Sequence, residues 1–222
     1  MKVLWLDTET TGLDPAANRI TEVAARYENY DAVGAGAVRD FHRYVCHEQY
    51  PADYMAPGGA GELTGLTPEI LAERGVPERV AYGDLQAFLN QCVDRFNKRD
   101  KMVLAGYCVH FDDGFLRALF ERYDNKYYGS YFWKKSLDVA SIVMHAVLRK
   151  RIPPLDDYKL KTVCNHLGVE NDAHGAVSDA LATRAVYHKL VWPEMAQEPA
   201  SEPAPAQAQD DEPISLFDEG EQ

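Results

Sequence analysis

Short apolar stretches at the start of the chain predict buried strands. Residues 2–6, Lys-Val-Leu-Trp-Leu, are typical of a buried strand that ends at Asp7. Residues 20–27 alternate apolar and polar positions enough to form a second strand, and residues 37–46 predict a third. We therefore expect the chain to open with a meander of three strands.

Apolar residues at helical spacing predict an α/β fold after this meander. Residues 84–97 have the 3–4 spacing of an amphipathic helix, whereas the Pro- and Gly-rich residues 50–65 predict a long irregular loop. Thr67-Pro68-Glu69 resembles a helix cap followed by Pro at the first helical position, which predicts a short helix through Leu71. The other expected elements are short strands at 102–105 and 137–139, helices at 115–123, 160–167 and 177–191, and a helix running to Leu148. Gly168 is the expected stop of the helix before it, and the order of elements predicts a mixed sheet.

The composition changes abruptly near residue 193. From there to about Asp211 the residues are mainly Pro, Ala, Gln, Glu and Asp, which is typical of a disordered segment. We therefore expect one folded domain over residues 1–192 and a disordered acidic tail over residues 193–222. Nine acidic residues and no Lys or Arg follow residue 193, so residues 1–193 carry a net charge of only −3 of the total −12. The negative total charge therefore does not exclude nucleic acid as a partner of the folded part.

Composition also restricts the cellular setting. No apolar run approaches the roughly 18 residues that cross a bilayer, and Asp7 interrupts the apolar N-terminal stretch, so we expect no signal peptide and no membrane partner. The four cysteines form no CxxC pair and lie far from zinc-finger spacing. Free thiols in a reducing cytoplasm are the expectation.

The first candidate for chemistry is Asp7-Thr8-Glu9-Thr10-Thr11-Gly12. Alternation along an extended strand places Asp7 and Glu9 on one face, roughly 6–7 Å apart. Two carboxylates held together are electrostatically costly unless a cation lies between them, and their oxygens suit Mg²⁺ or Mn²⁺. A polar hairpin turn after a strand is the alternative interpretation.

Two further segments offer partners for these carboxylates. Residues 110–116, His-Phe-Asp-Asp-Gly-Phe-Leu, place Asp112 where an expected strand leads into a helix. Asp112 could also be a helix cap, and Asp113 is the rival carboxylate. Residues 174–180, His-Gly-Ala-Val-Ser-Asp-Ala, place a titratable His174 five residues before Asp179, with small residues that allow a helix to approach the sheet. A lone histidine before a helix is otherwise a simple exposed or satisfied side chain.

Taken together, the three segments carry a family resemblance over residues 1–191. DTET at 7–10, FDxxFL at 111–116 and HxAxxDA at 174–180 resemble the three motifs of the DnaQ-like DEDDh exonucleases, a family that includes polymerase proofreading subunits, RNase T and oligoribonuclease. Gly-Leu-Thr at 65–67, Tyr-Lys-Leu at 158–160 and Leu-Gly-Val at 167–169 agree with it. Cys108, where the family often has Asn, and Glu-Leu-Thr at 62–64, where His or Asn is frequent, depart from the pattern and leave substrate preference open.

The resemblance implies a ribonuclease H-like mixed sheet flanked by helices, and a 3′-5′ exonuclease with two Mg²⁺ or Mn²⁺ ions. By resemblance, Asp7 would bridge both ions, Glu9 and Asp179 would complete the site on the nucleophile side, and Asp112 would hold the other ion. His174, with an ordinary pKa near ~6.5, would remove the proton from the attacking water, so activity should rise from mildly acidic pH. The products would be nucleoside 5′-monophosphates. The expected substrate-binding residues are Thr8, Thr10, Gly12, Leu13, Gly65, Leu66 and Phe111, with Leu13 and residues 63–66 as candidates for wedging beside the terminal base.

The end of the tail contains apolar residues in polar surroundings. Ile214-Ser215-Leu216-Phe217 resembles the sliding-clamp-binding pentapeptide of bacterial replication proteins, with Pro213 in place of the usual Gln. Ile214, Leu216 and Phe217 are therefore candidate partner-binding residues, although a chance match and an acidic tail that repels DNA are alternatives. The leading hypothesis is an enzyme that acts on single-stranded DNA or a DNA 3′ end, free or with a DNA polymerase. RNA 3′-end trimming and a non-catalytic clamp-tethered adaptor are the rivals.

Overall fold

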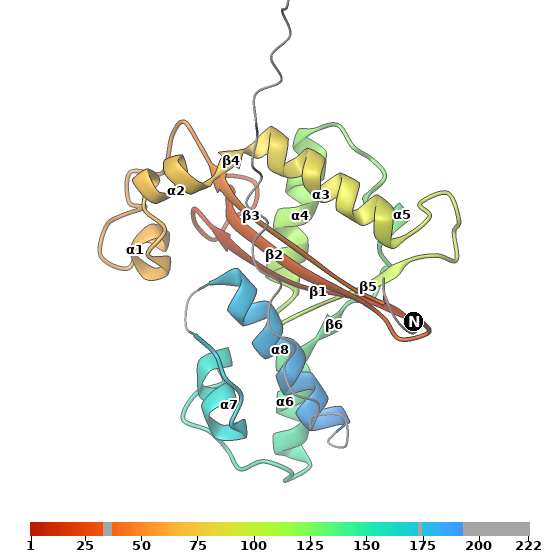
Figure 1. The fold of residues 1–222 in the computed structure, drawn as a ribbon. Coiled ribbons are helices and arrows are strands. Elements are labelled where there is room, and N and C mark those ends of the chain that lie inside the picture. The colour runs from red at the N-terminus through yellow and green to blue at the C-terminus, as the bar shows by residue number, and fades with distance from the viewer. Residues whose placement is uncertain (33–36, 173–174, 193–222) are drawn as a thin grey trace, which may run out of the picture.

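A mixed β-sheet forms the centre of the molecule. The computed structural model describes residues 1–32, 37–172 and 175–192, and within them the sheet has six strands in the order β4-β3-β2-β1-β5-β6 (Figure 1). The strands β1 to β3 pair antiparallel, as the predicted meander requires, whereas β5, β6 and β4 each run parallel to their neighbours. The strands are β1 (Lys2–Thr10), β2 (Ile20–Asn29), β3 (Val38–Cys46), β4 (Val76–Pro77), β5 (Met102–Gly106) and β6 (Leu137–Asp138).

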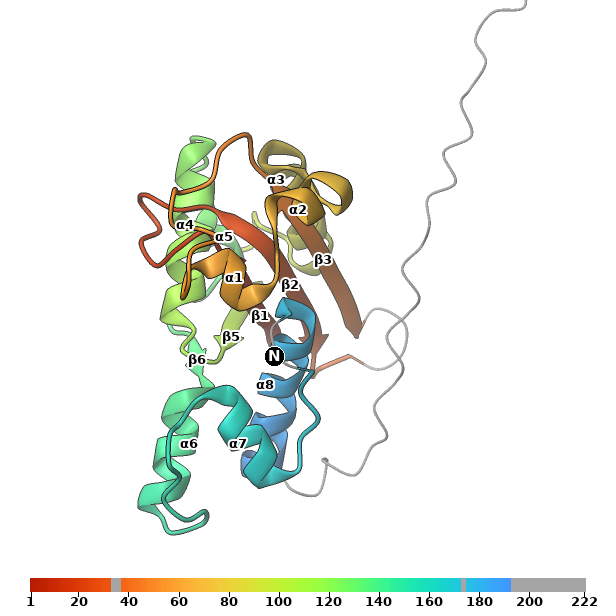
Figure 2. The same cartoon turned by 90° about the vertical axis from the view of Figure 1, so that its left-hand side faces the viewer.

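Helices cover both faces of this sheet, which confirms the predicted α/β class. Figures 1 and 2 show α3, α4 and α5 on one face and α6, α7 and α8 on the other, with α1 and α2 beyond one end of the long strands. The helices are α1 (Ala60–Thr64), α2 (Pro68–Arg74), α3 (Glu78–Cys92), α4 (His110–Arg122), α5 (Tyr128–Tyr131), α6 (Val139–Leu148), α7 (Leu160–Leu167) and α8 (Ala176–Val191).

Alternation along β1 divides the core into two layers. Leu4 and Leu6 belong to the apolar cluster that includes residues of α3, α4 and α5, whereas Val3 and Trp5 belong to the cluster with α6, α7 and α8. Because side chains alternate between the faces of a strand, the odd-numbered positions that follow Trp5 also face the α8 side. The sheet core therefore determines which side Asp7 and Glu9 face.

The predicted end of the first strand at Asp7 is wrong. β1 continues to Thr10 because its backbone stays paired with β2 beyond the last pair with β5, which is Trp5 with Ala105. The ladder to β2 includes Glu9 opposite Glu22 and shifts register only after Glu9. Backbone pairing thus keeps this polar segment extended.

Three other boundaries also differ from the prediction. The expected loop at 50–65 contains α1 at its end, α3 begins at Glu78 rather than Asp84 and ends at Cys92, and α4 begins at His110 rather than Phe115. Glu78, in the first turn of α3, forms an ion pair with Arg122 of α4, with N to O at 2.7 Å. The predicted spacing missed the first turns of α3 and α4 and extended α3 beyond its observed end at Cys92.

Other local predictions are confirmed. The Thr67 hydroxyl accepts a hydrogen bond from the backbone N of Ile70, so it caps α2. Gly168 ends α7 in the left-handed region, with φ of 62°, which L side chains rarely adopt. The four cysteines are free thiols. Among the described residues, no helix combines the length and apolar character that crossing a membrane requires.

Candidate metal centre

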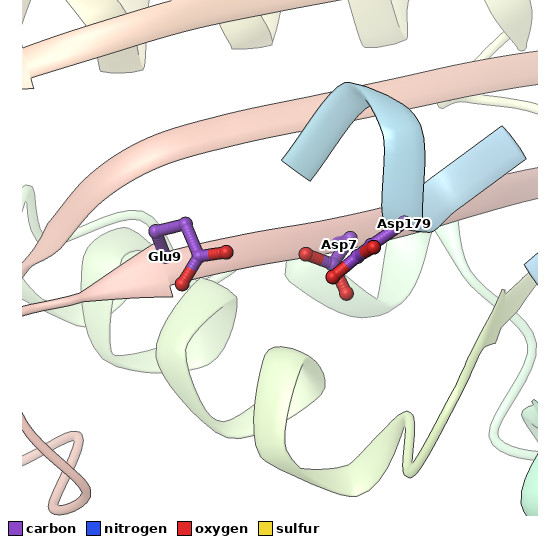
Figure 3. Close-up of side chains that lie close together, drawn as sticks. All are labelled: Asp7, Glu9 and Asp179. Carbon is purple, nitrogen blue, oxygen red and sulfur yellow. The ribbon is translucent and has the colours of Figure 1, made fainter. Parts of the chain in front are cut away.

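Three carboxylates from two elements meet on the α8 face of the sheet. Asp7 and Glu9 project from β1, and Asp179 projects from α8 toward Asp7 (Figure 3). One carboxylate oxygen of each residue lies within 4.8 Å of the other two. In the described part of the chain, these three side chains form a group that could hold a metal ion. The strand alternation that predicted a shared face for Asp7 and Glu9 is confirmed.

Small residues bring α8 close enough to deliver Asp179. Ala176 and Ala180 are buried, at 0% and 2% exposed. Asp179 lies in the first turn of the helix, where the unpaired N–H groups and the helix dipole favour negative charge. The predicted close approach of this helix to β1 is therefore confirmed.

Asp112 reaches the same region from α4. It is 3% exposed and its Oδ1 accepts a hydrogen bond of 2.7 Å from the Thr8 hydroxyl. Thr8 lies between Asp7 and Glu9 on β1, so this bond ties the second motif to the first. The alternative that Asp112 caps the helix is wrong, because Val109 holds the N-cap position of α4.

The neighbouring carboxylate, Asp113, is engaged elsewhere. Its Oδ2 lies 2.7 Å from Nε of Arg117, and its Oδ1 accepts a hydrogen bond of 2.5 Å from the Tyr128 hydroxyl. The Arg117 guanidinium also lies over the Tyr128 ring, 4.4 Å from its centre. Asp113 thus fastens α5 to α4, and of the two adjacent aspartates Asp112 is the one joined to β1.

Crowding and burial make these carboxyl groups hold protons. Burial, and then the charge of Asp112 and its acidic neighbours, raise the pKa of Asp7 well above its ordinary value. Burial, and then the charge of Glu22, raise the pKa of Glu9 to about 8. Burial also raises the pKa of Asp112 to about 7, although the hydrogen bond from Thr8 opposes this rise. The folded chain therefore crowds carboxyl groups that cannot all ionise together unless a cation takes the place of their protons.

The donor set fits a hard divalent cation. All the groups that converge are carboxylate oxygens, the ligands that Mg²⁺ and Mn²⁺ prefer, and the described cluster includes no thiol or imidazole that would favour a softer metal. A divalent ion would offset the mutual repulsion that raises these pKa values. Asp7, Glu9 and Asp179 are the residues that would hold it, with Asp112 beside them.

The threonine and glycine residues of the first motif support its backbone. The hydroxyls of Thr8 and Thr10 make bonds within the protein, to Asp112 and to the carbonyl oxygen of Gly12. A Cβ on Gly12 would lie 2.6 Å from the side chain of Asn18, so only glycine fits there without movement. Leu13, the next residue, is 85% exposed.

The other predicted substrate-binding residues are distributed between surface and core. Gly65 has φ of 70°, and the carbonyl oxygen of Leu66 accepts a hydrogen bond from the buried Tyr54 hydroxyl. Leu66 is buried, and Phe111 packs against Phe115, whereas Leu63 is 58% exposed. Leu13 and Leu63 are therefore the wedge candidates with free apolar surface.

Two groups of predicted residues lie outside the described part of the chain. One is His174, the predicted general base. The other comprises the tail residues Ile214, Leu216 and Phe217.

Glu22 is an acidic residue of this region that the sequence analysis did not single out. It is 2% exposed on β2, opposite Glu9 in the strand register, and its charge is the largest charge contribution to the raised pKa of Glu9. A glutamate within the mainly apolar stretch Ile-Thr-Glu-Val-Ala-Ala at 20–25 was the available signal.

Comparison with protein families gives a match over most of the chain. The model of the RNase_T family, described as an exonuclease, matches residues 4–187. DNA polymerase III subunit epsilon of Rickettsia conorii is 29% identical over 198 residues, which cover 86% of this chain and 74% of that protein. The PolC-type DNA polymerase III of Oceanobacillus iheyensis is 26% identical over 186 residues, which cover 83% of this chain but only 11% of the polymerase.

Solved structures give a similar result. Escherichia coli exonuclease I in complex with a dT13 oligonucleotide superposes with a TM-score of 0.65 at 25% identity, over 87% of this chain. The zinc-bound exonuclease I complex with single-stranded DNA gives a TM-score of 0.64 at 25% identity, over 88% of this chain. The match spans about two fifths of those exonuclease I chains, 42% in both cases.

Proposed function

We propose that this protein, which belongs to the exonuclease family and is a 3′-5′ exonuclease, removes nucleoside 5′-monophosphates from DNA 3′ ends. The proposed setting is replication proofreading or repair. The observation that carries this proposal is the group of Asp7, Glu9 and Asp179 oxygens within 4.8 Å of one another. DNA is favoured as substrate because the relatives include a DNA polymerase III epsilon subunit and the similar exonuclease I structures hold DNA.

The proposed cofactors are two Mg²⁺ or Mn²⁺ ions. When bound, such ions neutralise the phosphate and stabilise the attacking and leaving oxygens of a displacement. Asp7, Glu9 and Asp179 would hold them, and Asp112 would complete the set from α4. The Thr8 hydroxyl, which donates to Oδ1 of Asp112, would keep that side chain oriented.

The remaining steps belong to side chains of this protein. His174, which precedes α8 in sequence, would accept the proton of the attacking water. The exposed Leu13 and Leu63 would pack against the terminal base, since every base offers an apolar face and such contacts give little sequence preference.

The test is a nuclease assay on two matched polymers. Purified protein is incubated with 5′-labelled single-stranded DNA and with RNA of the same sequence, in Mg²⁺, Mn²⁺ or EDTA. We expect shortening from the 3′ end of the DNA, release of 5′-monophosphates, and no reaction in EDTA. Faster cleavage of RNA than DNA would instead favour RNA 3′-end trimming, and no cleavage of either would contradict the proposal.

Variants separate the proposed roles. Asp7→Ala should lose activity and weaken Mn²⁺ binding, whereas His174→Ala should lose activity at neutral pH and still bind Mn²⁺. Asp156→Ala, at an exposed aspartate of the segment between α6 and α7, is the matched control and should resemble the unmodified protein. Near-normal turnover of His174→Ala at neutral pH would exclude this histidine as the base.

A sliding clamp is the second proposed partner. Residues 212–218 place Ile214, Leu216 and Phe217 in a short apolar motif of the kind that enters a groove on a partner. A peptide of these residues should bind a bacterial sliding clamp weakly, and the double change Leu216→Ala with Phe217→Ala should abolish binding. Fluorescence anisotropy measures both, and an unmodified peptide that does not bind would refute this partner.

A further inference from the structure

Two buried glutamates of β2 form hydrogen bonds to helix α8, one at its first turn and one further along the helix. Glu22 and Glu28 are six residues apart, an even number, so both project from the α8 face of the strand. They are 2% and 5% exposed. Glu22 Oε2 accepts a hydrogen bond of 3.3 Å from the backbone N of Ala176, and Glu28 Oε1 accepts one of 2.5 Å from Nε of Arg184. The two side chains thus form similar attachments at different places along α8.

The Glu22 attachment replaces a helix cap. Gly175, at the N-cap position of α8, has no side chain to accept the unpaired N–H groups of the first turn. The Glu22 carboxylate supplies an acceptor from the sheet instead, and its negative charge is favoured at a helix N-terminus. The start of α8 is therefore fixed to β2.

A second residue holds Glu22 in place. His42 of β3 has Nε2 2.7 Å from Oε1 of Glu22 and forms a hydrogen bond with it. The His42 ring also meets the Tyr44 ring edge to face, with centres 4.7 Å apart. Both oxygens of Glu22 are thus bonded, one to β3 and one to α8.

This arrangement connects the helix start to the metal ligands. Glu22 lies opposite Glu9 in the register of β1 and β2, and Asp179 follows Ala176 by three residues, in the same turn of α8. The preceding segment is tied to that turn as well, because the backbone N of Asp172 donates to the Ser178 hydroxyl at 3.0 Å. The Glu22 carboxylate therefore connects the strand that lies beside Glu9 to the helix turn that carries Asp179.

We propose that Glu22, held by His42, is a positioning residue that fixes the first turn of α8, and with it Asp179, against Glu9. This inference rests on the proposed function of the same site. Glu22 would act through α8 rather than touch the substrate. Residues that orient metal ligands in this way typically contribute about 10–100-fold to metal affinity or activity.

Glu28 supplies a matched control for the experiment. Its hydrogen-bond donors are Trp5, Tyr30 and Arg184, so it is buried on the same strand and attached to the same helix, but at a distance from the first turn. Glu22→Ala and Glu28→Ala are compared in the full chain by three measurements: thermal unfolding, Mn²⁺ binding by calorimetry without DNA, and kcat and KM on single-stranded DNA. Both variants should melt earlier than the unmodified protein.

Only the Glu22 variant should change the metal site. We expect Glu22→Ala to lose about 10–100-fold in kcat and in Mn²⁺ affinity with little change in KM, while Glu28→Ala keeps both. Glu22→Gln, which retains an oxygen for the backbone N of Ala176, should recover part of the loss. Normal kcat and Mn²⁺ affinity in a Glu22→Ala protein that melts early would overturn the positioning role.

Two further outcomes remain decisive. If Glu22→Ala does not fold, His42→Ala takes its place beside Glu28→Ala, and unchanged Mn²⁺ affinity and kcat in His42→Ala would refute the inference. If the unmodified protein binds Mn²⁺ but cleaves no DNA, the proposed function fails. The comparison of Mn²⁺ affinities between the Glu22 and Glu28 variants then decides the positioning role by itself.

Discussion

Removing the charge of Glu9 should stabilise the metal-free protein. Burial and the charges of Glu22, Asp179 and Asp112 raise the pKa of Glu9 from 4.5 to about 8. Between these two pH values the folded protein keeps a proton that the unfolded chain releases. The contribution of Glu9 to the stability of the metal-free protein should therefore be most favourable below about pH 4.5 and should decline as the pH rises to about 8.

The size of the effect follows from this pKa. At about 1.4 kcal/mol for each tenfold change in proton affinity, the rise at Glu9 corresponds to about 5 kcal/mol of lost stability. Because repulsion is shared among the carboxylates, we assign about half of it, about 2–3 kcal/mol, to the Glu9→Gln change. In a domain of this size that is a Tm increase of about 4–12 °C at about pH 8.

Thermal unfolding followed by circular dichroism measures this effect. The unmodified protein and Glu9→Gln are melted in EDTA at about pH 5 and about pH 8, and again with Mn²⁺ at the higher pH. We expect Glu9→Gln to melt higher only at the higher pH, and Mn²⁺ to stabilise the unmodified protein more than the variant. Glu73→Gln, at an exposed glutamate of α2, should change neither result. A Glu9→Gln protein that is no more stable than the unmodified one in EDTA at about pH 8 would refute the electrostatic reasoning.

Four other substitutions test neighbouring features. Asp112→Asn should lower nuclease activity at least about 10-fold. Asp113→Asn should instead lower the stability by about 1–2 kcal/mol and leave Mn²⁺ binding intact. Nuclease assays and thermal melts that show the reverse would exchange the roles of the two aspartates. Thr8→Val should raise the pKa of Asp112 further above about 7, so Mn²⁺ affinity by calorimetry should fall more at about pH 6.5 than at about pH 8.5, and an equal loss at both would contradict this. Cys108→Asn should raise stability by about 0.5–1 kcal/mol, because Asn tolerates the left-handed φ of 59° at this position better, and a lower Tm would be the opposing result.

The sequence predicted the parts of the site that follow from local periodicity. Alternation along a strand placed Asp7 and Glu9 on one face, and the small residues Ala176 and Ala180 indicated the close approach that brings Asp179 to them. Each of these inferences needs only the geometry of a single element. The meander and the helix before Gly168 were predictable for the same reason.

Contacts between distant residues were beyond this reasoning. The partners of Glu22 lie 20 and 154 positions away along the chain, and no local pattern encodes such pairings. Likewise, the choice between Asp112 and Asp113 was open because both fit the start of a helix, and only the hydrogen bond from Thr8, 104 positions away, separates them. The apolar spacing that extended the predicted helix to Asn97 included Phe96, which is 83% exposed.

The small cluster of Tyr54, Leu66 and Leu71 has a consequence for how this enzyme could be altered. These residues form an apolar core of their own, separate from the two that enclose the sheet. The segment carrying Leu63 therefore packs on a small core of its own, which Tyr44 and Cys46 of β3 adjoin. Under the proposed role of Leu63 beside the terminal base, transplanting residues 50–66 from a relative should change substrate selectivity while the carboxylates stay unchanged.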